Sequence, residues 1–185
     1  DTLGAGIGWA RSITFNPALA EQFKACFART GTFGLGVCNG CQMFAELADT
    51  IPGAQDWPRF TTNQSERFEA RFSMVEVLGS PSLFFKDLAG MRMPIAVAHG
   101  EGYANFKYRG NAAKAIAAMR FVDHTGAATE AYPFNPNGSP AGLTAVTTAD
   151  GRFTAMTPHP ERVFRNTQMS WNGLDANDHS PWLQL

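Results

Sequence analysis

The chain has 185 residues, of which 44% are hydrophobic and 17% charged, and its formal net charge is −1. This length and composition predict one globular domain with a substantial core and exclude a disordered chain. The sequence has no basic block, which argues against nucleic acid as the main partner, and no apolar run of the roughly 20 residues that span a membrane. The first residues lack the basic and apolar regions of a signal peptide, and three cysteines are too few for a disulfide scaffold. We therefore expect a cytoplasmic protein.

Helical and strand patterns are mixed along the chain. The glycine-rich residues 1–8 have a weak likeness to a phosphate loop. Asn16-Pro17 forms an N-cap and a favoured first helical residue, and apolar spacing continues that helix to about residue 29. The other predicted elements are a strand at 32–37, a helix at 40–49, a strand at 68–78, a short helix at 82–88, a strand at 93–98, a helix at 112–119, and strands at 120–123, 142–147 and 152–156. This mixture predicts an α/β layered domain.

The stretch from Phe33 to Leu47 is the most informative part of the sequence. An apolar run leads to Cys38, which has Gly36 and Gly40 on either side, and a helical pattern follows at once. This is the pattern of a strand–turn–helix elbow that holds a nucleophile in a strained turn. We expect glycine at both flanking positions because a side chain there collides with backbone or forbids an unusual dihedral angle. The nearby helix N-terminus favours the thiolate form of the cysteine.

Cys38 and Cys41 also spell C-x-x-C, so a redox dithiol and half of a zinc site are alternatives. Only one further cysteine, Cys26, is present, and no second C-x-x-C or nearby histidine pair completes a zinc site. A buried structural thiol is the remaining alternative for Cys38. Cys41 is better explained as an inward-facing helix residue.

A cysteine nucleophile needs a base and a group that orients the base. His159 follows a predicted strand, and Glu161 is close enough in sequence to accept a hydrogen bond from its imidazole. The backbone N–H of Asn39 is placed by the elbow to stabilise an oxyanion. His99 also follows a predicted strand, and in open α/β sheets the site lies beyond the carboxyl ends of strands.

Taken together, these residues resemble the triad-type, class I glutamine amidotransferases. The elbow motif Gly-x-Cys-x-Gly-x-Gln of that family is matched from Gly36 to Gln42, and its His-x-Glu motif is matched by His159 and Glu161. Five segments narrow the resemblance to the glutaminase domain of phosphoribosylformylglycinamidine synthases in their large, single-chain form. These segments lie at 36–42, 67–72, 94–102, 132–139 and 158–164.

The resemblance implies a three-layer, flavodoxin-like fold with a mostly parallel sheet. It also implies that glutamine is hydrolysed through a γ-glutamyl thioester on Cys38, with His159 as base and then acid and Glu161 as its orienting group. The N–H of Asn39 is then one oxyanion donor. By motif position, the resemblance assigns glutamine binding to Gln42, His99, Gly100 and Glu101.

In such enzymes the ammonia passes through a channel to a synthase domain of the same polypeptide. There ATP and Mg²⁺ convert formylglycinamide ribonucleotide to the amidine in purine biosynthesis. The resemblance implies no cofactor or metal in the glutaminase domain itself, and no nucleic-acid or membrane partner.

The sequence differs from the family pattern at its start. In the family, a strand–helix unit and a loop carrying a second oxyanion donor come before this point, and Asp1 matches the last residue of that loop. The expectation is therefore that residues 1–185 are a glutaminase domain truncated at both ends. Because one oxyanion donor is worth about 10²- to 10³-fold in rate, we expect the segment alone to be weakly active or inactive.

Overall fold

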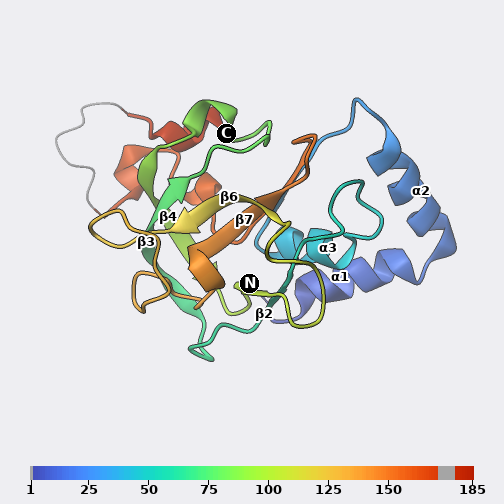
Figure 1. Cartoon of the computed structure of the whole chain (residues 1–185), viewed down its shortest axis with the longest axis horizontal. Helices are drawn as coiled ribbons and strands as arrows, with labels where there is room; N and C mark the ends of the chain where they lie inside the picture. Colours follow the sequence, from blue (N-terminus) through green and yellow to red (C-terminus); the bar gives the residue numbers. More distant parts are fainter. Residues whose placement is uncertain (1, 171–177) are drawn as a thin grey trace.

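A six-stranded mixed sheet forms the centre of the computed structural model, which describes residues 2–170 and 178–185 (Figure 1). The helices are α1 (Ala5–Thr14), α2 (Pro17–Ala28) and α3 (Asn39–Glu46). The strands are β1 (Gly34–Val37), β2 (Arg59–Thr61), β3 (Glu69–Val77), β4 (Arg92–His99), β5 (Tyr103–Asn105), β6 (Ile116–Phe121), β7 (Leu143–Thr147) and β8 (Phe153–Met156). Short 3₁₀ turns are η1 (Lys86–Leu88), η2 (Pro140–Gly142), η3 (Pro160–Arg162), η4 (Asn166–Gln168) and η5 (Pro181–Gln184).

The α/β class predicted from the sequence is confirmed, but the mostly parallel sheet is not. The strand order is β1-β8-β7-β6-β3-β4, and only β1 and β8 pair in parallel, while the other four pairings are antiparallel. A parallel connection needs a long crossover, usually a helix, and the described chain has no α-helix after α3. The sheet is therefore built largely from antiparallel neighbours, such as the short β7–β8 hairpin.

Four strands nevertheless end at the same edge of the sheet. The pairing directions make β1, β8, β6 and β4 run the same way, so their carboxyl ends share one edge. The sheet also curls, because the backbone N–H of His159 donates to the carbonyl of Ala96 in β4 at 2.8 Å. The edge strand β4 therefore lies against the segment that follows β8.

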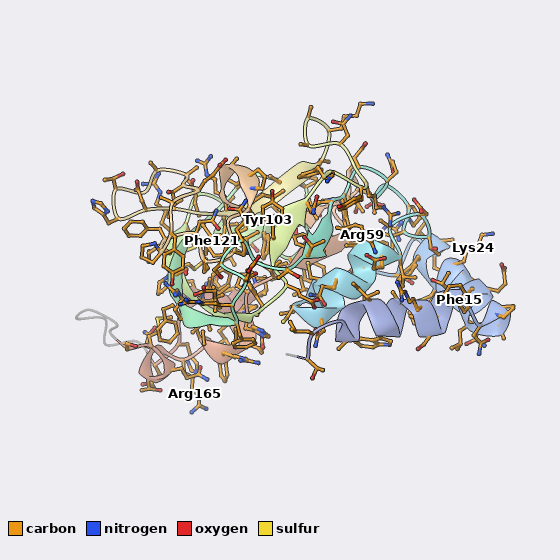
Figure 2. All side chains as sticks on the ribbon, turned by 90° about the horizontal axis from the view of Figure 1, so that it is seen from below. Phe15, Lys24, Arg59, Tyr103, Phe121 and Arg165 are labelled. Carbon is orange, nitrogen blue, oxygen red and sulfur yellow. The ribbon has the colours of Figure 1, made fainter. Side chains whose placement is uncertain are left out.

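Two hydrophobic cores cover the two faces of the sheet. One core lies under the helices and includes Phe27, Phe44 and Phe153, whose rings meet edge to face. The other includes Phe121 and Trp182, and 3₁₀ turns rather than α-helices cover it. Figure 1 shows α3 between the sheet and the pair α1 and α2, and Figure 2 labels Phe15 and Lys24 at this helical end and Arg165 at the other.

Several predicted elements are confirmed close to their expected bounds. Helix α2 begins at Pro17, and the side chain of Asn16 accepts a hydrogen bond from the N–H of Leu19 at 3.2 Å, which is an N-cap. Strand β1, helix α3 and the β7–β8 hairpin also lie where the sequence predicts them. These elements carry strong local signals, namely caps, glycines and short apolar runs.

Residues 112–119, predicted as a helix, are not helical. Residues 116–121 form β6 instead, which pairs with β3 in regular register and with β7 in an irregular one. The alanines of this segment favour a helix intrinsically, but strand formation depends on the neighbours a segment finds. Met119 and Phe121 are fully buried between those neighbours.

The alternating segment forms β3 as predicted, but its apolar side chains face outward. Phe68, Phe72 and Met74 are 52%, 40% and 38% exposed, whereas Glu69 and Ser73 are 3% and 6% exposed. The core side of β3 is completed further along by two fully buried valines, Val75 and Val77. The alternation therefore identified a strand but not its buried face.

The glycine-rich start forms a helix rather than a phosphate loop. Helix α1 packs on α3, and a Cβ atom at Gly6 would lie 2.5 Å from the carbonyl oxygen of Asn39 and 2.6 Å from the Gln42 side chain. Glycine at this position therefore allows the close approach of the two helices. Asp1 lies outside the described residues.

Arg152 joins the end of α2 to the β7–β8 hairpin. Its Nη1 donates to the carbonyl oxygens of Phe27, Arg29 and Thr32, at 3.4, 2.8 and 2.9 Å. Its Nε donates to Asp150 at 2.7 Å. One guanidinium therefore satisfies carbonyls that a helix end leaves without partners.

Within the described residues, no helix has the length and apolar character needed to cross a membrane.

Candidate active site

Cys38 occupies a strained turn between β1 and α3. Its backbone angles are φ 54° and ψ −108°, in a region that side-chain-bearing residues rarely adopt. A Cβ atom at Gly36 would lie 2.6 Å from the carbonyl oxygen of Gly40, so glycine is required at position 36. At Gly40 a Cβ atom would meet nothing within 4 Å. The predicted elbow is present, and the predicted clash holds for Gly36 and is wrong for Gly40.

The Cys38 thiol is buried beside the end of β4. Its side chain is 8% exposed, and Sγ donates a long hydrogen bond to the carbonyl of Ala98 at 3.9 Å. Burial raises the pKa of the Cys38 thiol above its ordinary value, although the N–H of Asn39 and the charge of Arg162 oppose this effect. Burial of the thiol therefore acts against the helix N-terminus, which favours the thiolate.

His159 and Glu161 form a hydrogen-bonded pair after β8. Nδ1 of His159 lies 2.6 Å from Oε1 of Glu161, and the imidazole is 7% exposed. Burial by itself raises the pKa of the Glu161 carboxyl, but its hydrogen bond with His159 and the charge of that ring bring it below the ordinary value. A carboxylate on Nδ1 places the remaining lone pair or proton of the ring at Nε2.

Nε2 of His159 is buried and has no hydrogen-bond partner in the described structure, so the Cys38 thiol is not bonded to it. Glu161, the partner of His159, is nevertheless close enough to Cys38 for its charge to act on the thiol. An open hollow of about 430 Å³ adjoins the histidine, and its apolar wall contains Val37 and Trp182. In free enzymes such catalytic hydrogen bonds are often long and tighten only when substrate binds.

Gln42 and Glu101 lie together on the other side of the elbow. Nε2 of Gln42 donates to the backbone oxygen of Glu101 at 3.0 Å and to its Oε2 at 3.1 Å. The N–H of Gly4 donates to the same Oε2 at 2.9 Å. Oε1 of Gln42 is buried without a partner. The structure thus brings these two residues of the predicted glutamine site together.

The side chain of His99 is placed differently. The ring is 1% exposed, and its two nitrogens face the carbonyl of Thr157 and the side-chain amide of Asn137, each at 3.3 Å. A Cβ atom at Gly102 would lie 2.3 Å from the ring. His99 is therefore enclosed by protein, with both ring nitrogens facing protein groups, and the assignment of the turn from His99 to Glu101 to glutamine binding stays a prediction. Gly100 follows in the same turn and is also buried, and a Cβ atom there would lie 2.7 Å from the side chain of Leu3.

Two asparagines at the site were missed from the sequence. Asn63 and Asn137 are 1% and 0% exposed and bond to the turn from His99 to Gly102. The sequence favours an exposed loop at 63–67 and an ordinary turn at 135–139, because asparagine, proline and glycine are typical of turns. Two asparagines followed by a serine, in the run from Asn135 to Ser139, were the available signal of a buried polar network.

Cys41 is fully buried in the core under the helices, as predicted. Burial raises its pKa well above the ordinary value, and the nearby Cys38 adds to this effect. Cys26, Cys38 and Cys41 are all free thiols. Among the described residues, no group of three or more histidines, cysteines or carboxylates is arranged to hold a metal ion.

Comparison with known proteins places the chain in a family. The model of the CobB/CobQ-like glutamine amidotransferase domain matches residues 1–185. The structure of PurLQS from Thermotoga maritima is similar, with a TM-score of 0.62 and 22% identity, over 92% of this chain and 66% of that chain. A glutamine amidotransferase from Thermotoga maritima matches with a TM-score of 0.47 and 17% identity, over 82% of this chain and 51% of that one.

The chain therefore spans 66% and 51% of the lengths of these two proteins. The likeness to PurLQS shows a shared α/β fold. The family model covers every residue of the sequence, and its description agrees with the elbow and His-x-Glu motifs. The chain belongs to the CobB/CobQ-like glutamine amidotransferase domain family.

Proposed function

We propose that this domain hydrolyses glutamine with Cys38 as nucleophile and supplies the ammonia to a synthase domain that makes formylglycinamidine ribonucleotide. The observation that carries the proposal is the strained Cys38 elbow beside the preformed His159–Glu161 pair. A backbone strained in this way is maintained only where the surrounding structure enforces it, and such strain clusters at active sites.

In the proposed reaction, Sγ of Cys38 attacks the side-chain amide carbon of glutamine while His159 takes the thiol proton. The same histidine then gives this proton to the leaving nitrogen, so ammonia departs and a γ-glutamyl thioester remains. Water, deprotonated by His159, attacks the thioester, and the returning proton restores the thiol as glutamate is released. Glu161 holds the imidazole in the orientation that both proton transfers need.

The N–H of Asn39 is proposed to stabilise the oxyanion that forms in each step. This residue is the first of α3, and its N–H already interacts with the Cys38 thiol. A donor of this kind is worth about 10²- to 10³-fold in rate. Gln42 and Glu101 are proposed to hold the glutamine substrate, with Gly100 shaping the turn. Support for this comes from their contact with each other near the elbow.

The synthase reaction is proposed from the sequence motifs of the chain. The segments at 67–72 and 132–139 resemble phosphoribosylformylglycinamidine synthases rather than other amidotransferases. The match to PurLQS over 66% of that chain is consistent with a glutaminase that works beside further protein. We propose that the synthase domain belongs to the same polypeptide and uses ATP and Mg²⁺, and that a channel carries the ammonia to it. We also propose that the enzyme works in the cytoplasm and that the glutaminase domain itself uses no cofactor.

Labelling by a glutamine analogue tests the glutaminase reaction. Diazo-oxo-norleucine should alkylate Cys38 in the full-length protein, and glutamine should protect it. The Cys38→Ser variant should take up no label, whereas Cys26→Ser, which changes a partly exposed free thiol, should label like the wild type. Labelling at another residue, or no protection by glutamine, would contradict the proposal.

A second assay tests the synthase assignment. The full-length protein should release ADP when formylglycinamide ribonucleotide, ATP and glutamine are all present, and ammonia should replace glutamine in the Cys38→Ser variant. Glutaminase activity without ribonucleotide-dependent ADP release would support the proposed glutaminase reaction and contradict the proposed synthase reaction.

A further inference from the structure

Asn63 bonds to both ends of the turn from His99 to Gly102, which carries Glu101. Nδ2 of Asn63 donates to the carbonyl of His99 at 2.8 Å, and its Oδ1 accepts from the N–H of Gly102 at 2.9 Å. The backbone N–H of Asn63 donates to the carbonyl oxygen of Gly100 at 2.9 Å. Nδ2 also reaches the carbonyl of Arg67 at 2.9 Å. Both ends of the turn therefore depend on one buried side chain.

Asn137 fixes the other side of the same turn through the His99 ring. Its Oδ1 accepts from the N–H of Ser139 at 3.0 Å and from the hydroxyl of Ser139 at 2.7 Å. This leaves Nδ2 as the group that faces Nε2 of His99, so Nδ2 donates and Nε2 accepts. Nδ1 then carries the proton and donates to the carbonyl of Thr157.

His99 is consequently a neutral ring with both nitrogens used inside the protein. Burial, with the charge of His159 adding to it, lowers the pKa of His99 to about 4 against the opposing hydrogen bond to Thr157. The ring therefore stays uncharged at neutral pH beside a histidine that must gain and lose a proton.

The network also reaches the proposed acid–base residue. Thr157 lies two residues before His159, and the N–H of His159 bonds to β4 next to the same turn. On the other side, Glu101 of the turn accepts hydrogen bonds from Gln42 of α3. Hydrogen bonds thus connect the His159 segment, the Glu101 turn and the elbow helix.

We propose that Asn63 and Asn137 are positioning residues that, through His99, hold Glu101 and the His159 segment at a fixed separation for glutamine. In this network His99 is a neutral link and does not contact the substrate. The inference rests on the proposed glutaminase function. It assigns roles to the segments at 63–67 and 135–139, which the proposed chemistry leaves unused.

Asparagine-to-aspartate changes test the network because they keep the shape and replace only the amide donor. In Asn63→Asp a carboxylate oxygen would face the carbonyls of His99 and Arg67, and the turn should shift. Leaving buried groups without partners costs enough to weaken binding by about tenfold or more. In Asn137→Asp the carboxylate would face Nε2 of His99 and should draw a second proton onto the ring.

We expect the KM for glutamine to rise about tenfold or more in Asn63→Asp of the full-length protein, with a smaller change in kcat. Alkylation of Cys38 by iodoacetamide should stay within about twofold of the wild type, because that reagent does not use Glu101. Asn111→Asp is the matched control, since Asn111 is exposed and its Oδ1 acceptor survives the change. A KM for Asn63→Asp equal to that of Asn111→Asp would overturn the inference.

Hydrogen exchange at the imidazole C2 position, followed by mass spectrometry, gives a readout that does not need glutamine, and its wild-type measurement needs no variant. In the wild type, His99 should exchange slowly and show no titration between pH 5 and 8, whereas Asn137→Asp should bring its titration into that range. Titration of wild-type His99 near its ordinary value of about 6.5 would overturn the inference. If wild-type His99 exchanges slowly and does not titrate between pH 5 and 8, but the protein has no glutaminase activity, the result would instead contradict the proposed function.

Discussion

The neutral, buried His99 predicts that the region around it loses stability in mild acid. Its pKa is lowered to about 4, mainly by burial, whereas an unfolded histidine has a pKa of about 6.5. As the pH falls below about 6.5, His99 takes up a proton where this region is locally unfolded, but stays neutral where the region is folded. The stabilisation is therefore complete above that pH and is lost progressively down to about pH 4.

The magnitude follows from the two pKa values. A tenfold difference in proton affinity is worth about 1.4 kcal/mol, so the full effect is about 3 kcal/mol. Between pH 7 and pH 5 the loss is about 2 kcal/mol. The lowered pKa of Glu161 has its effect at lower pH, below the ordinary glutamate value of about 4.3, so this window isolates the histidine.

Backbone hydrogen exchange of the peptide that covers β4 and the following turn measures this loss in the full-length protein. After correction for the intrinsic pH dependence of exchange, the opening free energy should fall by about 2 kcal/mol from pH 7 to pH 5. Helix α2, which contains no histidine, is the internal control. His99→Gln should flatten the pH dependence. An equal dependence in His99→Gln, or none in the wild type, would refute the reasoning.

Three further outcomes follow from the packing. Gly36→Ala should destabilise the elbow by about 1–3 kcal/mol and abolish labelling of Cys38, because its Cβ atom would lie 2.6 Å from a carbonyl oxygen, whereas Gly40→Ala should unfold at nearly the wild-type temperature. Arg152→Lys should lower the melting temperature, since a single ammonium cannot replace a guanidinium that reaches three carbonyls and a carboxylate, and an unchanged melting temperature would contradict this. In the His159→Ala variant, the rate of Cys38 alkylation by iodoacetamide should increase with pH through the alkaline range. Its midpoint should lie above the ordinary thiol pKa of about 8.5, because burial favours the protonated thiol. A midpoint below about 8 would show that the helix N-terminus has the larger effect on the thiol.

The parts of the fold that the sequence predicted are those with local causes. Asn16 caps α2 through a contact three residues away, and the elbow at Cys38 needs only its own glycine and the helix that follows. The outward-facing Phe72 of β3 and the strand at 116–121 could not be predicted in this way. Both depend on which segments lie on the two faces of a curled sheet, and these segments are distant in the sequence.

The candidate site shows the same division at finer scale. His159 and Glu161 are separated by one residue, so chain geometry almost ensures the bond that the sequence predicted. Cys38 and His159 are brought together by contacts between distant segments: the pairing of β1 with β8, in which Val37 lies opposite Met156, and the bonds that each residue makes to β4. Register places residues in steps of about 3.3 Å, while a hydrogen bond requires an accuracy of a few tenths of an ångström. A strand pattern can therefore predict that both residues reach the same edge of the sheet, but whether the thiol bonds to Nε2 depends on packing around the site, including the buried amides of Asn63 and Asn137.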